Sequence, residues 1–274
     1  GSKYSEVVCQ YTAWLAEHKN SKIKIYHILE KNLAPVRQDL SGAINLGART
    51  KLLEDLSESD AIGAKTKHSE GWKILEKAKE TLNSNGKFII ETRLRSGDLA
   101  EALSKKEQGA DVIVIGKRGK RKQDSGSKLG LNFERIVRAS KKPIFVANRK
   151  FQKIEKVLVA FDGSPPTKRI VDFISRYDFF SAAEVILTYA GRSMELIKEP
   201  FSKAAIQLQD AGIRVNTLEL KGDPKQELAK LIPEEGFDLL AMGAYGHSKV
   251  RSFILGSTTT QLIQTVKVPV VLTR

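Results

Sequence analysis

The chain has 274 residues, which is enough for one large domain or two ordinary ones, and 41% of them are hydrophobic. Its single cysteine, Cys9, excludes an internal disulfide and is typical of a reducing compartment. There is no apolar run of about 18 residues and no signal-peptide pattern, so the sequence predicts a cytoplasmic protein without a membrane span.

The net charge of +14 is concentrated in the first half of the chain. Residues 1–150 hold 30 Lys/Arg and 18 Asp/Glu, whereas residues 151–274 hold 16 Lys/Arg and 14 Asp/Glu. Such an excess favours solubility in general. The more specific alternative is that the first half binds an anionic partner.

The first half alternates predicted strands and helices. KYSEVVCQYTAWLAEH (3–18) is expected to be helical, and a longer helical insert is expected at roughly 42–85. Short β-branched runs predict the strands of this half at 22–29, 87–95, 111–116 and 143–148.

The second half alternates in the same way, and most of its strand runs are near-continuously apolar, as in strands buried on both faces. The alternation predicts an α/β fold with open parallel sheets and helices on both faces. The predicted strands are 156–162, 184–190, 214–221, 238–243 and 268–274.

A repeat relates the two halves. Gly116 and Gly243 lie 127 residues apart, and the flanking segments are alike. A period this long indicates duplicated domains, 1–150 and 151–274, because the units of solenoids are shorter. The matching segments are 97–119 with 222–246, and 141–149 with 266–274.

The stretch GAYGHSKVRSFILGST (243–258) joins a predicted strand to a predicted helix. Ser257 is predicted to cap that helix, whose start offers free N–H groups and the positive end of the dipole. Asp162 closes another strand, and ligands of open sheets bind beyond such ends, where the strand order reverses. The pattern suits phosphate binding, although glycines also serve turns and Ser-Thr also caps helices.

These residues resemble a known family. Two residues separate Gly243 from Gly246, nine separate Gly246 from Gly256, and Ser257 follows. This spacing resembles the nucleotide motif of the universal stress protein family. The segment VLVAFDGS (157–164) resembles the first strand of that family and its aspartate. The resemblance covers nearly the whole chain as two tandem copies. It implies two tandem flavodoxin-like or Rossmann-like domains of five strands each, and ATP or AMP binding in many members.

The resemblance also implies a nucleotide site in the second domain. Asp162 would contact the base or ribose. The other assigned residues would line the adenine through their backbone (Ala160, Phe161, Ala190), flank the ribose and phosphates (Met242, Gly243, Tyr245, Gly246), or hold phosphate oxygens (Gly256, Ser257, Thr258, Thr259).

The first half departs from this motif. Ten residues, 120–129, precede Gly130, and Leu131 stands where the motif has a hydroxyl residue. We therefore expect one nucleotide site, in the second domain, and a degenerate site in the first. The basic loop of the first half is either a solvated loop or a polyanion site. Its cations are Lys117, Arg118, Lys120, Arg121 and Lys122.

Alignment of the repeats places Gly1-Ser2 on Gly163-Ser164, so the first half has no counterpart of the strand KVLVAFD (156–162). In the family's sheet order that strand is central. We expect about seven or eight residues ending in an acidic residue to precede Gly1 in the natural protein, because unpaired buried backbone groups cost roughly 1–3 kcal/mol each.

The two final strands, PIFVAN (143–148) and VPVVL (268–272), are expected to pair, because each would otherwise leave an open edge. The halves would then form an intramolecular pseudo-dimer, and the sequence leaves a homodimer open.

The sequence carries no Walker A, HxGH, SGGxDS or GxSxG motif and no Cys/His cluster. We therefore interpret the chain as a nucleotide-binding stress-response protein with a regulatory role and an unknown protein partner. Slow hydrolysis of ATP, with Mg²⁺ beside the nucleotide, stays open. The alternative is a non-catalytic scaffold whose basic first domain recruits an anionic partner.

Overall fold

A computed structural model describes residues 3–17, 21–29, 46–84, 88–117, 129, 131–245 and 255–274. The chain divides into two compact units, one of residues 22–99 and one of residues 1–21 together with 100–274. Within the described ranges, no helix is long and apolar enough to cross a membrane.

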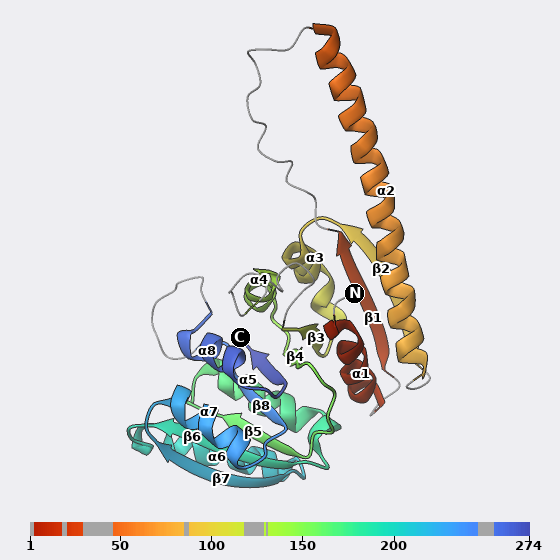
Figure 1. The fold of residues 1–274 in the computed structure, drawn as a ribbon. Helices are drawn as coiled ribbons and strands as arrows, with labels where there is room; N and C mark the ends of the chain where they lie inside the picture. Colours follow the sequence, from red (N-terminus) through yellow and green to blue (C-terminus); the bar gives the residue numbers. More distant parts are fainter. Residues whose placement is uncertain are drawn as a thin grey trace. The chain divides into compact units, whose positions relative to one another are not determined.

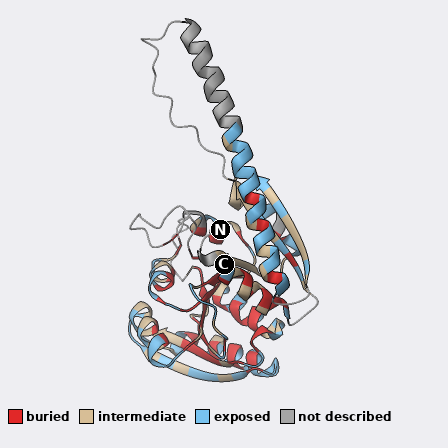
Figure 2. Cartoon of the chain, turned by 45° about the vertical axis from the view of Figure 1, so that its right-hand side comes forward, coloured by how far each residue is buried: buried red, intermediate tan, exposed pale blue. Residues whose placement is uncertain are grey.

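The unit of residues 22–99 pairs two parallel strands, β1 (Lys22–Leu29) and β2 (Ile89–Ser96), and packs them against the long helix α2 (Leu46–Ser84). The expected strands and helical insert are therefore present. Helix and sheet approach closely at Gly71, where a Cβ would lie 2.7 Å from Cδ1 of Leu94. Of the α2 residues coloured in Figure 2, most are exposed.

The other unit is built on a sheet in the order β3-β4-β9-β8-β5-β6-β7 (Figure 1). Every neighbouring pair is parallel except β4 with β9. All of its strands lie within or beside the predicted runs. They are β3 (Ile113–Gly116), β4 (Ile144–Ala147), β5 (Lys156–Ala160), β6 (Glu184–Gly191), β7 (Arg214–Lys221), β8 (Leu239–Gly243) and β9 (Val270–Thr273).

Helices cover both faces of this sheet, which gives the predicted α/β fold. Two of them begin with the residues that favour a helix start. Pro165 and Pro166 open one helix, and Asp223 caps another by accepting the N–H of Lys225 at 2.8 Å. The helices are α1 (Lys3–Glu17), α3 (Leu99–Lys106), α4 (Leu131–Ala139), α5 (Pro165–Arg176), α6 (Lys198–Asp210), α7 (Pro224–Glu234) and α8 (Ser257–Thr265).

The last strands of the two repeats join them into one sheet. Strands β4 and β9 pair antiparallel, with Phe145 opposite Val271, and both of these side chains are fully buried. The expected pairing of the two final strands is confirmed.

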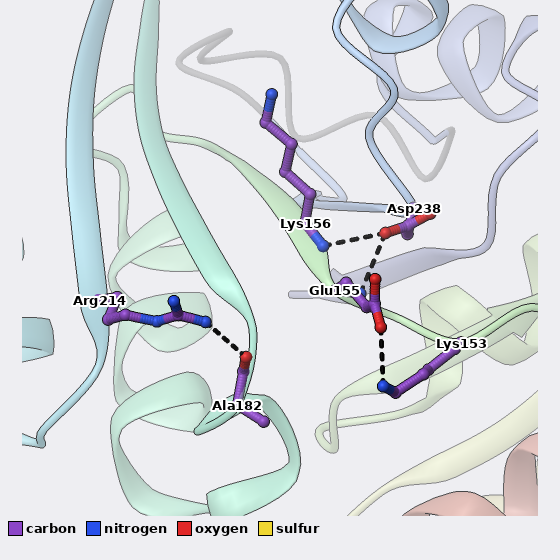
Figure 3. A network of polar contacts seen from close by, with 6 residues as sticks. All are labelled: Lys153, Glu155, Lys156, Ala182, Arg214 and Asp238. Atoms are coloured by element: carbon purple, nitrogen blue, oxygen red, sulfur yellow. Dashed lines mark hydrogen bonds and ion pairs between the residues drawn. The ribbon is translucent and has the colours of Figure 1, made fainter.

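Strand β5 lies between β6 and β8, where the strand order reverses. Figure 3 shows how its start is fixed. The Asp238 carboxylate accepts the N–H groups of Glu155 and Lys156 at 3.0 and 2.9 Å, and the Asp238 N–H donates to the Lys156 carbonyl at 2.8 Å. One aspartate at the start of β8 thus aligns the first residues of the neighbouring strand.

The first repeat differs in its sheet. Among the described strands, β3 pairs only with β4 and β1 only with β2, whereas their counterparts β8 and β6 each flank β5. No described strand takes the place that β5 has in the second repeat. The domain boundary near residue 150 stays a prediction.

Tyr11 fixes α1 to the sheet and to the segment between the repeats. Its side chain is fully buried, with its ring 4.9 Å from that of Phe145 and 4.8 Å from that of Phe151. Its hydroxyl accepts the Gln152 N–H at 3.2 Å. Burial raises the pKa of this phenol to about 12.

We predict that Tyr11→Ala lowers the free energy of unfolding by about 3–5 kcal/mol, because a large aromatic ring is removed from a packed core. Tyr11→Phe keeps the ring and loses only the hydroxyl contacts, so we expect the free energy of unfolding to fall by only about 1 kcal/mol. Urea unfolding followed by circular dichroism measures both. Equal losses for the two variants would contradict the packing role.

Cys9 is buried on α1, and this burial, with the nearby charge of Glu6, raises the pKa of its thiol from 9.0 to about 11. The neutral thiol is therefore favoured in the folded state, and the stability this provides is present below pH 9 and lost as the pH rises toward 11. At pH 8 we expect iodoacetamide to modify Cys9 far more slowly in the native protein than in urea. Mass spectrometry of timed samples checks this, and equal rates would show that the thiol is accessible.

Candidate functional site

The predicted site lies at the carboxyl ends of β5 and β8, next to the starts of α5 and α8. Gly243 ends β8 and allows close packing there. A Cβ on this residue would lie 3.0 Å from Cβ of Pro166 and 3.2 Å from Cγ2 of Thr167. The glycine therefore lets the end of β8 approach the first turn of α5.

Asp162 follows β5 and is held by the turn that leads into α5. Its Oδ1 accepts the N–H of Ser164 and the hydroxyl of Thr167, both at 2.9 Å. The turn needs Gly163, whose φ of +78° is in the region that favours glycine. The carboxylate is thus fixed by its own turn at the carboxyl edge of the sheet.

Helix α8 begins differently from the prediction. Its N-cap is Gly256, not Ser257, and no side chain caps it. The first intrahelical bond runs from the Thr260 N–H to the Gly256 carbonyl at 2.8 Å, so the three preceding N–H groups have no partner within the helix. The extended conformation of Gly256 makes Ser257 the first helical residue, and its side chain is exposed.

The Thr259 side chain links the first turn of α8 to the end of β8. This side chain is buried, and its hydroxyl donates to the Gly243 carbonyl at 3.1 Å. The Gly256 N–H donates to the Ala244 carbonyl at 3.3 Å, and the Ala244 N–H donates to the Thr273 carbonyl at 2.8 Å. Together these bonds fix the start of α8 against β8 and β9.

The hydrophobic members of the predicted site have buried or half-buried side chains. Phe161 is buried against Phe201, with ring centroids 6.0 Å apart, and its N–H donates to the Thr188 carbonyl. Met242 is buried within β8. The remaining described members are half-buried near strand or helix ends: Ala160, Ala190, Tyr245 and Thr258. Gly246 lies outside the described residues.

One residue of the predicted polyanion cluster is not available to a ligand. Lys117 is buried, and its Nζ donates at 2.7 Å to the carbonyl of Val266 at the end of α8. A cation stabilises this end of a helix. The other four cations of the cluster, Arg118, Lys120, Arg121 and Lys122, lie outside the described residues.

Sequence reasoning missed Ser164 and Thr167, which hold the Asp162 carboxylate. The signal was a hydroxyl residue two and five positions after the aspartate, in DGSPPT (162–167). It also missed a groove of about 510 Å³ formed by α6, β7 and the turn before α6. This groove contains none of the predicted site residues. Its lining is Met194, Glu195, Lys198, Phe201, Ser202, Ala205, Ile206, Thr217 and Glu219.

Comparison with known proteins relates the chain to one family. The sequence model of the Universal stress protein family matches residues 1–148 and 180–274. Universal stress protein Slr1230 of Synechocystis sp. is 31% identical over 98% of this chain and 96% of its own length. Universal stress protein MJ0577 of Methanocaldococcus jannaschii is 31% identical over 31% of this chain and 48% of its own length.

A crystal structure of a universal stress protein from Archaeoglobus fulgidus has the same fold. It aligns with a TM-score of 0.68 and 19% identity, over 99% of this chain and 93% of that chain. Fold and sequence together define an α/β protein of the tandem stress-protein type. The chain belongs to the universal stress protein family.

We predict that Thr167→Val lowers the free energy of unfolding by about 1–3 kcal/mol, because the Asp162 carboxylate loses a hydrogen-bond donor beside a buried position. Thr167→Ser keeps the hydroxyl and serves as the matched control, with a smaller loss. Urea unfolding measures both variants. A tolerated valine together with a destabilising serine would show that packing, not the hydrogen bond, matters here.

Proposed function

We propose that the chain is a regulatory stress-response protein that binds ATP or AMP at the carboxyl edge of its second repeat. The observation that carries this proposal is the start of α8. Its first-turn N–H groups have no partner in the helix, and the exposed Ser257 lies beside them.

The donor groups fit a phosphate. Backbone N–H groups at a helix start bind anions, and the positive end of the helix dipole favours their charge. In this proposal Ser257 adds its hydroxyl, Gly243 and Gly256 leave room for the phosphates, and Asp162 accepts from a ribose hydroxyl or from the base. The backbone at Ala160, Phe161 and Ala190, with Met242 and Tyr245 nearby, would border the adenosine.

A binding role is favoured over a catalytic one. Asp162 is the carboxylate that follows β5, and its Oδ1 is already engaged by Ser164 and Thr167. Efficient hydrolysis needs a base positioned to activate water. If Mg²⁺ accompanies the nucleotide, the phosphates would be its main ligands, because no group of three or more His, Cys, Asp or Glu in the described part of the chain could hold a metal.

Isothermal titration calorimetry with ATP and with AMP tests the proposal. We expect Asp162→Ala and Gly256→Val to abolish binding, the first by removing the acceptor and the second by crowding the phosphates. Asp172→Ala is the control, because it removes a carboxylate from an exposed position of α5 that contacts Gln207. It should leave the affinity unchanged.

Unchanged affinity in Asp162→Ala and Gly256→Val would refute this site. Absence of nucleotide binding, together with salt-dependent binding of a polyanion such as heparin, would favour the scaffold with an anionic partner instead.

A further inference from the structure

The paired strands β1 and β2 have one face toward α2 and one face away from it. A Cβ on Gly71 of α2 would lie 2.7 Å from Cδ1 of Leu94 and 3.1 Å from Cδ2 of His27, so these two side chains point toward the helix. Successive side chains of a strand alternate between the two faces, and their neighbours therefore point away from α2. The outward face consists, in paired order, of Lys22 with Ile89, Lys24 with Glu91, Tyr26 with Arg93, and Ile28 with Arg95.

The outward face is cationic. Four of its eight residues are Lys or Arg, and Glu91 is the one acidic residue of both strands. Glu91 forms an ion pair with Lys22 and lies 3.8 Å from Arg93. The hydrogen bond from Lys22 and the surrounding positive charge hold the pKa of the Glu91 carboxyl below its usual range. In the described part of the chain, Lys24 and Arg95 form no ion pair, so this face keeps an excess of positive charge.

The side chains of the outward face are accessible to a partner. All four of its cations are exposed. Tyr26 is 36% exposed and lies opposite Arg93, with Lys24 two residues before it on the same face. Ile89, at the start of β2, is 65% exposed. An aromatic ring thus lies among cations on an open sheet surface.

The second repeat has uncharged residues at the matching places. Its strand β7 turns Thr217 and Glu219 toward the groove beside α6, so the side chains between and after them point to the other face. The helix α7 packs against β6 and β7, and Ile186 and Thr188 of β6 are buried. The first repeat thus differs in the side chains themselves. The matching positions are Lys24 with Ile186, Tyr26 with Thr188, Arg93 with Leu218, and Arg95 with Leu220.

Single-stranded nucleic acid has the chemistry that this face recognises. Its phosphates pair with Lys and Arg, and its unpaired bases stack on exposed aromatic rings. Side chains two residues apart on a strand are about 6.6 Å apart, so the two cations of each strand can contact neighbouring phosphates. The bases of a duplex are stacked on one another, and an acidic peptide has none. Neither of these polyanions offers a free base to Tyr26.

We propose that the outward face of β1 and β2 binds single-stranded nucleic acid, with Tyr26 as the stacking platform and the four cations as phosphate contacts. The site lies within the unit of residues 22–99. It goes beyond the proposed function, because the residues assigned to ATP or AMP all belong to the second repeat.

Fluorescence anisotropy of the whole 274-residue chain with a labelled oligouridine of about 12 nucleotides tests the proposal. Four cations less one carboxylate leave about three phosphate contacts, so a plot of log K against log salt should have a slope of about −2. Lys24→Gln and Arg95→Gln should each reduce the steepness of that slope by about 0.7. Lys73→Gln is the matched control, because it removes an exposed cation from α2 in the same unit, and it should leave the slope unchanged.

Tyr26 separates base stacking from general attraction to a polyanion. Tyr26→Ala should weaken oligouridine binding by about 10-fold, because a base loses its stacking partner. Tyr26→Phe keeps the ring and should retain the affinity. Circular dichroism of each variant checks that the fold is kept. Heparin has no bases, so its binding should be equally strong in all three proteins.

Three results would overturn the proposal: no oligouridine binding at about 50 mM salt, an equal effect of Lys73→Gln and Lys24→Gln, or unchanged affinity in Tyr26→Ala. The last result would mean that the face attracts polyanions of any kind. Calorimetry with ATP on Arg95→Gln keeps this test apart from the proposed function. Its ATP affinity should be that of the unchanged chain, and loss of oligouridine binding alone leaves the nucleotide site intact.

Discussion

Strand β5 is hydrogen-bonded along both edges, and the second repeat depends on this arrangement. β5 pairs in parallel with β6 on one side and with β8 on the other, so the strand order reverses at β5. The carboxyl end of β5 therefore lies where the connections diverge, and Asp162 follows it there. Without a doubly paired central strand, the same residues would lie on separate pieces of sheet, as the strands of the first repeat do.

Local patterns predicted the elements well, because buried strands and amphipathic helices leave periodic signals within a few residues. The strand boundaries agree closely, and the β4–β9 pairing followed from the equivalence of two strands that each end a repeat. The fold class and the family were therefore accessible from the sequence.

Details that depend on distant partners were not accessible. The charge of Lys117 suggested a surface site, but its acceptor is the carbonyl of Val266, 149 residues away. The resemblance suggested Thr259 as a phosphate ligand, and its hydroxyl bonds to the carbonyl of Gly243 at the end of β8. Ser257 was an attractive cap, yet Gly256 takes that position. The sequence shows which residues can donate or accept hydrogen bonds. Only the packing of strands and helices determines which of these groups lie close enough to bond.

The bond between Lys117 and Val266 has a consequence for the electrostatics of α8. The helix has 9 residues, so its two ends are about 14 Å apart. A buried cation from the first repeat neutralises the partial negative charge at one end, while the opposite end keeps its partial positive charge exposed. Solvent would screen the effect of the Lys117 charge on the other end of the helix, since the Debye length is about 8 Å at physiological salt. Through the protein interior the screening is much weaker. Through Lys117, the first repeat thus contributes to the electric field at the start of a helix that belongs to the second repeat.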